Sequence, residues 1–138
     1  MTKAVNWQSA AAPQLADFEE MAAVAWERLP DEFRARAGDL LIRVEDFPTD
    51  EVLDALGLQD PFELLGLYHG VSLDRKSVTD LPRQPDMVFL YRRPMLEEWA
   101  EGGETLGDLI THVLVHEIGH HFGFSDADME NIEAATTG

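Results

Sequence analysis

The chain has 138 residues, no cysteine, and 27 acidic against 10 basic residues, giving a formal net charge of −17 at pH 7. This length suits one domain, spanning residues 1–138, with a single hydrophobic core. The lack of cysteine excludes a disulfide framework and thiolate chemistry. The negative charge argues against nucleic acid and anionic membranes as partners, because both are polyanions. We see no secretory signal and no transmembrane run, so we expect a cytoplasmic location.

The first half of the chain predicts helices and one strand. Apolar residues recur at helical spacing from Leu15 to Leu29, and Pro30 marks the end of that helix. Residues 40–47 alternate between apolar and polar side chains, which predicts a strand. Residues 48–56 indicate a short helix that begins at a threonine or an aspartate.

The second half continues the mixture of strands and helices. We expect strands at residues 64–71 and 87–91, and helices at 94–100, 106–122 and 126–134. The charged, proline-containing segment 72–86 is expected to be a loop that overhangs a cleft. Short strands mixed with helices predict an α+β domain, in which a small mixed sheet packs on a buried helix with flanking helices.

The helix expected at residues 106–122 has clear boundary signals. A Gly-Gly pair precedes it, and Thr105 with Asp108 forms a variant of the capping box. Its apolar residues cover almost the whole circumference, so the helix should be buried. Polar side chains in such surroundings are costly unless they have partners.

Those polar side chains form the pattern H-E-x-x-H-x-x-G-x-x-D, which starts at residue 116. His116 and His120 are four positions apart, so on a helix they point in directions that differ by about 40° and can bind one metal ion. Gly123 permits a sharp turn, after which Asp126 can supply a third ligand. Three protein ligands and one open position describe a catalytic zinc site.

The sequence also predicts a mechanism. Zinc lowers the pKa of its bound water to about 7, and Glu117 is placed to accept the proton as general base and to pass it to the leaving amine.

The chain resembles the bacterial minimal zincin-like metallopeptidase family. The resemblance includes the motif at 116–126, the early helix, and the segments at 41–46, 64–70 and 87–94. It implies a zincin-like fold with His116, His120 and Asp126 as zinc ligands and Glu117 as the catalytic base. It also implies a peptide or protein substrate, which an exposed sheet edge would bind as an added strand, with Met87–Tyr91 as the candidate edge. The aspartate in the third-ligand position differs from the histidine of metzincins, and Met129 lies too close to that position to form their methionine turn.

Several neighbouring residues are alternatives or helpers. Asp128 and Glu130 are alternatives to Asp126 as third ligand, although their spacing fits the pattern less well. His112 lies one turn before His116 and is a candidate outer-shell residue, whereas His121 points elsewhere on the helix. Among the aromatic and histidine side chains near the strands, one can donate a hydrogen bond to the developing oxyanion; the candidates are Tyr68, His69 and Tyr91.

Two other functions fit parts of the pattern. One is a non-catalytic zinc-binding module that keeps the fold. The other is a zinc-dependent RNA endonuclease, which the missing third histidine and the negative charge oppose. An intact Glu117 favours an enzyme, because a binding module does not need a general base.

Overall fold

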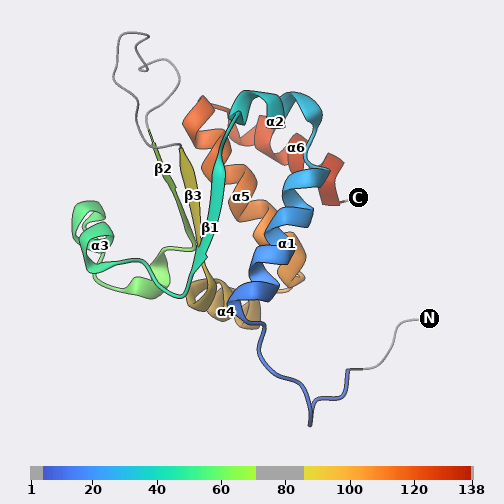
Figure 1. The fold of residues 1–138 in the computed structure, drawn as a ribbon, viewed down its shortest axis with the longest axis vertical. Helices are drawn as coiled ribbons and strands as arrows, with labels where there is room; N and C mark the ends of the chain where they lie inside the picture. The colour runs from blue at the N-terminus through green and yellow to red at the C-terminus, as the bar shows by residue number, and fades with distance from the viewer. Residues whose placement is uncertain (1–4, 71–85, 138) are drawn as a thin grey trace.

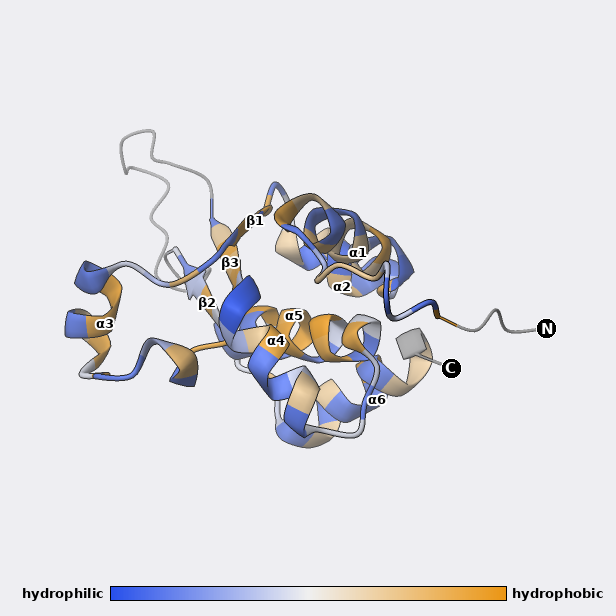
Figure 2. Ribbon diagram, turned by 90° about the horizontal axis from the view of Figure 1, so that it is seen from below, coloured by the Kyte–Doolittle hydropathy of each residue, from blue (hydrophilic) through white to orange (hydrophobic). Residues whose placement is uncertain are grey.

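The structure is a computed structural model that describes residues 5–70 and 86–137. In chain order its elements are α1 (Leu15–Arg28), α2 (Asp31–Ala37), β1 (Leu41–Glu45), α3 (Asp50–Leu56), the 3₁₀ turn η1 (Pro61–Glu63), β2 (Gly66–His69), β3 (Met87–Tyr91), α4 (Arg92–Glu101), α5 (Leu106–Phe122) and α6 (Asp126–Thr137). The predicted α+β class is confirmed. Helices α1, α5 and α6 lie on one side of a small sheet, and α3 projects away on the other (Figures 1 and 2).

The sheet has three strands in the order β1-β3-β2. Strand β3 pairs with β1 in parallel and with β2 in antiparallel fashion. The prediction that Met87–Tyr91 is the edge strand is therefore wrong. Val88 and Leu90 are fully buried, and such an apolar strand is stabilised best between two neighbours. Within the described residues, the edges are β1 and β2.

Helix α5 runs through the centre of the core, with the bounds that the sequence predicts. Thr105 Oγ1 accepts a hydrogen bond from the Asp108 N–H at its start. At its end Gly123 takes the left-handed conformation with φ 73°, and the Phe124 N–H donates to the Gly119 carbonyl. Nine of its 17 residues are buried, and strands β2 and β3 and helices α1, α4 and α6 all contact it. The prediction of a buried helix is confirmed.

Helix α6 folds back along α5. Met129 is fully buried and packs where Gly119 has no side chain; a Cβ at Gly119 would lie 2.5 Å from the Met129 Sδ. A glycine inside a helix costs about 1 kcal/mol relative to alanine. Here it allows α6 to approach the histidine-bearing half of α5.

The structure adds one helix that the sequence did not predict, and it does not describe most of one expected loop. Helix α2 was not expected; it is short and charged, and only Phe33 and Ala37 are buried. Most of the expected loop 72–86 lies outside the described residues. No helix in the described ranges combines the length and the apolar character that a bilayer crossing requires.

Candidate metal and catalytic site

The polar end of α5 faces two different elements. His116 and Glu117 are neighbours in sequence, so their side chains leave the helix about 100° apart. Glu117 faces the edge strand β2, and His116 faces α6. The site is thus built where α5 passes between a strand and an antiparallel helix.

Glu117 is held by the backbone of β2. The Tyr68 N–H donates a hydrogen bond to Glu117 Oε1 at 3.1 Å. Burial raises the pKa of Glu117, and the hydrogen bond from the Tyr68 backbone and the nearby His120 partly offset that shift. A partly buried carboxyl group with a raised pKa has the properties of a general base.

Gly66 brings β2 close enough for this contact. A Cβ at Gly66 would lie 2.6 Å from Val113 Cγ1 and 3.4 Å from the Glu117 Cγ. Only a residue without a side chain therefore allows the strand to lie directly against α5. The sequence does not reveal this role, because the strand and the helix are about fifty residues apart.

The other side chain interactions of β2 tie it to α5 and to the start of β3. The Tyr68 hydroxyl donates to Asp86 Oδ2 at 3.1 Å, and the Tyr68 ring stacks on His121 with a centroid distance of 3.9 Å. Burial, together with the charge and hydrogen bond of Asp86, raises the pKa of Tyr68. Of the three residues considered for the oxyanion, Tyr68 thus has another partner, Tyr91 is only 1% exposed, and His69 is exposed.

On the α6 side, His116 lies among other potential metal ligands. His116 Nε2 is 3.8 Å from Glu133 Oε2, and His112 Nδ1 is 2.6 Å from Glu133 Oε1. The nitrogen and oxygen donors of His112, His116 and Glu133 all lie within 4.8 Å of one another. Burial and the neighbouring His112 lower the pKa of His116, which favours the neutral imidazole that a metal binds.

The structure places the predicted ligands around the same helix end. The His116 and His120 rings meet edge to face with centroids 6.0 Å apart. Asp126 begins α6 and is close enough for its charge to act on His116. Neither His120 nor Asp126 belongs to the close group formed by His112, His116 and Glu133. The ligand set His116, His120 and Asp126 stays a prediction.

The two alternatives to Asp126 have other surroundings. Asp128 N–H donates to Ser125 Oγ, and Asp128 Oδ2 accepts from the Ser125 N–H. This reciprocal pair is a capping box at the start of α6, so Asp128 has a structural role. Glu130 is exposed.

Sequence reasoning missed Glu133. Its spacing contains a signal, because Glu133 is seven residues after Asp126, and seven residues return to nearly the same face of a helix. That signal acquires meaning only once α6 is known to run back along α5. His112 was considered as an outer-shell residue, whereas its contact with Glu133 depends on the packing of the two helices.

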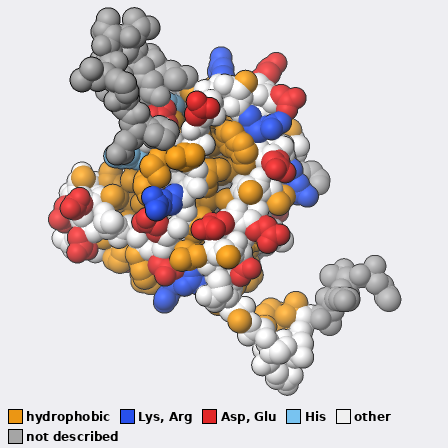
Figure 3. Space-filling view, viewed as in Figure 1, with side chains coloured by type: hydrophobic (Ala, Val, Ile, Leu, Met, Phe, Trp, Pro, Cys, Tyr) orange, Lys and Arg blue, Asp and Glu red, His pale blue; other side chains and the backbone are white. Residues whose placement is uncertain are grey.

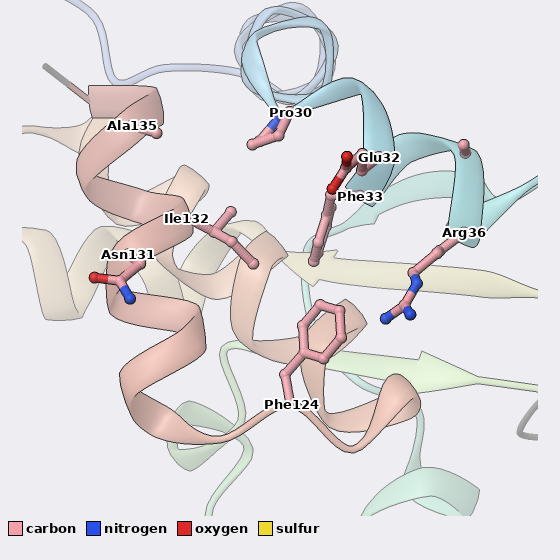
Figure 4. Close-up of a pocket in the computed structure, with 9 residues that line it drawn as sticks. Pro30, Glu32, Phe33, Arg36, Phe124, Asn131, Ile132 and Ala135 are labelled. Atoms are coloured by element: carbon pink, nitrogen blue, oxygen red, sulfur yellow. The ribbon is translucent and has the colours of Figure 1, made fainter.

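A separate pocket of about 710 Å³ lies between α2 and α6. Figure 4 shows the side chains that line it, including Phe33 and Arg36 from α2 and Ile132 from α6. No histidine lines it. Ile132 and Glu133 are adjacent and so point in different directions from α6, which separates this pocket from the histidine cluster.

A comparison with protein families places the chain. The model of the family described as zincin-like metallopeptidase matches residues 37–136. The chain belongs to the zincin-like metallopeptidase family. The matched region contains the whole sheet, α5 and most of α6, so the strand and helix that hold Glu117 and His116 are both part of it. A comparison with curated proteins finds no significant match.

Family membership implies zinc, and the donor set fits that metal. Neutral imidazole nitrogens and carboxylate oxygens are the ligands that zinc takes in open, catalytic sites. His116 Nε2 is buried and makes no hydrogen bond among the described residues, as expected of a nitrogen that binds a metal. The residues at the polar end of α5 therefore fit a zinc ion.

Proposed function

We propose that the protein is a zinc-dependent peptidase in which Glu117 acts as general base. The observation that carries the proposal is the position of Glu117, which accepts a hydrogen bond from the β2 backbone and lies near His120, on a helix of a zincin-like metallopeptidase. We assign His116, His120 and Asp126 as the ligands of the zinc. When bound, zinc supplies Lewis acidity to a water molecule and to the scissile carbonyl.

The chain's own residues supply the proton transfer. In the structure Glu117 Oε1 accepts the Tyr68 N–H, and a carboxylate oxygen has further lone pairs for a water proton. Burial raises the pKa of Glu117 toward neutral pH. A general base is most effective when its pKa lies near the pH at which it works. Glu117 would take a proton from the attacking water and return it to the leaving amine.

Strand β2 replaces β3 as the candidate for substrate binding. It is an edge strand in the described sheet, and the Tyr68 N–H points away from β3 toward Glu117. A peptide added along this edge would place its backbone beside the general base. Peptide bonds are thus the substrate class that this arrangement favours.

Digestion of peptides tests the proposal. We expect the wild-type protein to cleave members of a fluorogenic peptide library, with activity removed by a chelator and restored by zinc. Glu117→Gln should keep its fold and zinc content but lose roughly 100-fold or more of the rate, because the amide cannot accept the proton. Glu130→Gln, an exposed change of the same type, is the matched control and should keep full activity.

Other outcomes distinguish the alternative functions. Equal cleavage by zinc-loaded Glu117→Gln would rule out Glu117 as the base. If zinc-loaded wild type cleaves no peptide across the library, the proposed activity is contradicted and a zinc-binding module is favoured. Cleavage of RNA in place of peptides would favour the endonuclease. The net charge of −17 opposes this function, because RNA is a polyanion, and Figure 3 shows many acidic side chains on one face of the protein.

A further inference from the structure

Three histidines form a ladder along α5. His112, His116 and His120 are spaced by four residues, so successive members are about 6 Å apart along the helix axis and lie on neighbouring positions of one side. The His112 and His116 rings stack with centroids 4.2 Å apart, and the His116 and His120 rings are 6.0 Å apart. His116 is thus the middle member of two overlapping pairs.

Helix α6 presents one carboxylate to each pair. Met129 packs against Gly119, and Glu133, one turn farther along α6, reaches His112 and His116. The two helices are therefore antiparallel. Asp126 lies seven residues before Glu133 on the same face, about 10 Å along the helix, and its charge acts on His116. We therefore pair Glu133 with His112 and His116, and Asp126 with His116 and His120.

The distances at the Glu133 end suit a metal ion after small side-chain movements. Zinc bonds of about 2.0–2.2 Å in tetrahedral geometry place the donor atoms roughly 3.3 Å from one another. The His112 and Glu133 donors are 2.6 Å apart, and the His116 and Glu133 donors are 3.8 Å apart. Separation of the first pair and closer approach of the second would bring both toward that spacing, and the His112 and His116 donors already lie within 4.8 Å of each other.

We propose that His112, His116 and Glu133 form a second zinc position, which alternates with the position formed by His116, His120 and Asp126. The alternation, but not the second position itself, rests on the proposed peptidase site. His116 Nε2 has one lone pair and faces Glu133, so it binds one metal ion at a time. Zinc at the second position takes His116 away from the first.

The simpler role for Glu133 is an ion pair that fastens α6 to α5. The His112 side chain is 48% exposed, and ion pairs with an exposed partner contribute little to stability. If Glu133 only forms this ion pair, replacing its carboxylate should not change the affinity for metal. Metal binding in defined variants therefore separates the two roles.

The test removes the first position and measures what remains. In full-length His120→Ala/Asp126→Ala we expect about one zinc per chain by elemental analysis, and a rise of the melting temperature when zinc is added. Adding Glu133→Gln to this variant should weaken zinc binding by roughly 100-fold or more, beyond the effect of losing an outer-shell partner. Adding Glu130→Gln instead is the matched control and should change nothing.

Cobalt spectra give a second measurement in a background that keeps all the histidines. Wild-type protein titrated with Co²⁺ should show two overlapping sets of absorption bands at a total of one ion per chain, and Glu133→Gln should show one set. The proposal is overturned if the double variant binds no zinc while folded, or if Glu133→Gln alters neither zinc affinity nor the spectrum. Peptidase activity enters none of these measurements, so their failure is independent of failure of the proposed function.

Discussion

The two sides of α5 hold their functional groups in different ways. On the β2 side, Glu117 is fixed by a backbone N–H and by the close approach of Gly66. On the α6 side, His116 Nε2 makes no hydrogen bond within the described part of the chain and lies 3.8 Å from the Glu133 side chain at Oε2. A backbone donor cannot change rotamer, whereas imidazole and carboxylate side chains can. The proposed base Glu117 is thus held by the backbone, and the proposed metal ligands can still change rotamer to close on an ion.

The largest effect should come from replacing His116, the residue that both proposed metal positions share. We expect His116→Ala to lose zinc almost completely, because each position then keeps only two ligands. His121→Ala is the comparison on the β2 side: His121 stacks on Tyr68 and should not affect zinc content. Elemental analysis of both purified variants checks this.

The stability of the two variants sharpens the same comparison. The His121 side chain is 4% exposed, so its truncation should lower the melting temperature. His116→Ala should change it little in the absence of metal. Retention of stoichiometric zinc by His116→Ala would contradict both metal assignments.

A smaller effect is expected from a methyl group added on the β2 side. In Gly66→Ala the new Cβ meets Val113 Cγ1 at 2.6 Å and the Phe89 carbonyl oxygen at 3.1 Å. The short Val113 side chain of α5 has little freedom to yield, so β2 should move away from α5, with a loss of about 1–3 kcal/mol in the free energy of unfolding. Chemical denaturation measures the loss, and the displaced strand should also lower the catalytic rate.

Gly119→Ala is the matching change on the α6 side. Its Cβ meets the Met129 Sδ, the far part of a flexible side chain, and alanine also favours the helix. We therefore expect Gly119→Ala to cost less stability than Gly66→Ala. The reverse order would show that the α6 side is the more rigid one.

The same contrast explains what the sequence could predict. The bounds of α5 follow from local signals, namely the Thr105 cap, the apolar pattern and the turn at Gly123. The mixed α+β class follows from periodicity. Strand order does not, because β3 becomes central through pairing with two strands distant in sequence.

For the candidate site, the sequence predicts which residues share a helix and leaves open what that helix contacts. The positions of His116, His120 and Glu117 on α5 follow from their spacing alone. The contacts of Glu117 with β2 and of Glu133 with His112 require the tertiary packing of α5 against other elements. The motif therefore does not predict the hydrogen bond that holds Glu117 or the involvement of Glu133.

The smallest predicted effect separates the two aspartates at the start of α6. Asp128 forms the reciprocal pair with Ser125 that caps this helix, and loss of such a cap costs about 1 kcal/mol. Asp128→Ala should therefore lower the stability of the metal-free protein and leave its zinc affinity nearly unchanged. Asp126→Ala should weaken zinc binding and leave the stability of the metal-free protein nearly unchanged, because Asp126 is exposed and is assigned here as a zinc ligand.

Thermal melts of metal-free protein and competitive zinc titrations of both variants measure the two quantities. If Asp128→Ala weakens zinc more than Asp126→Ala does, the turn after Gly123 delivers a different carboxylate from the one assigned, and the first metal position must be redrawn around Asp128.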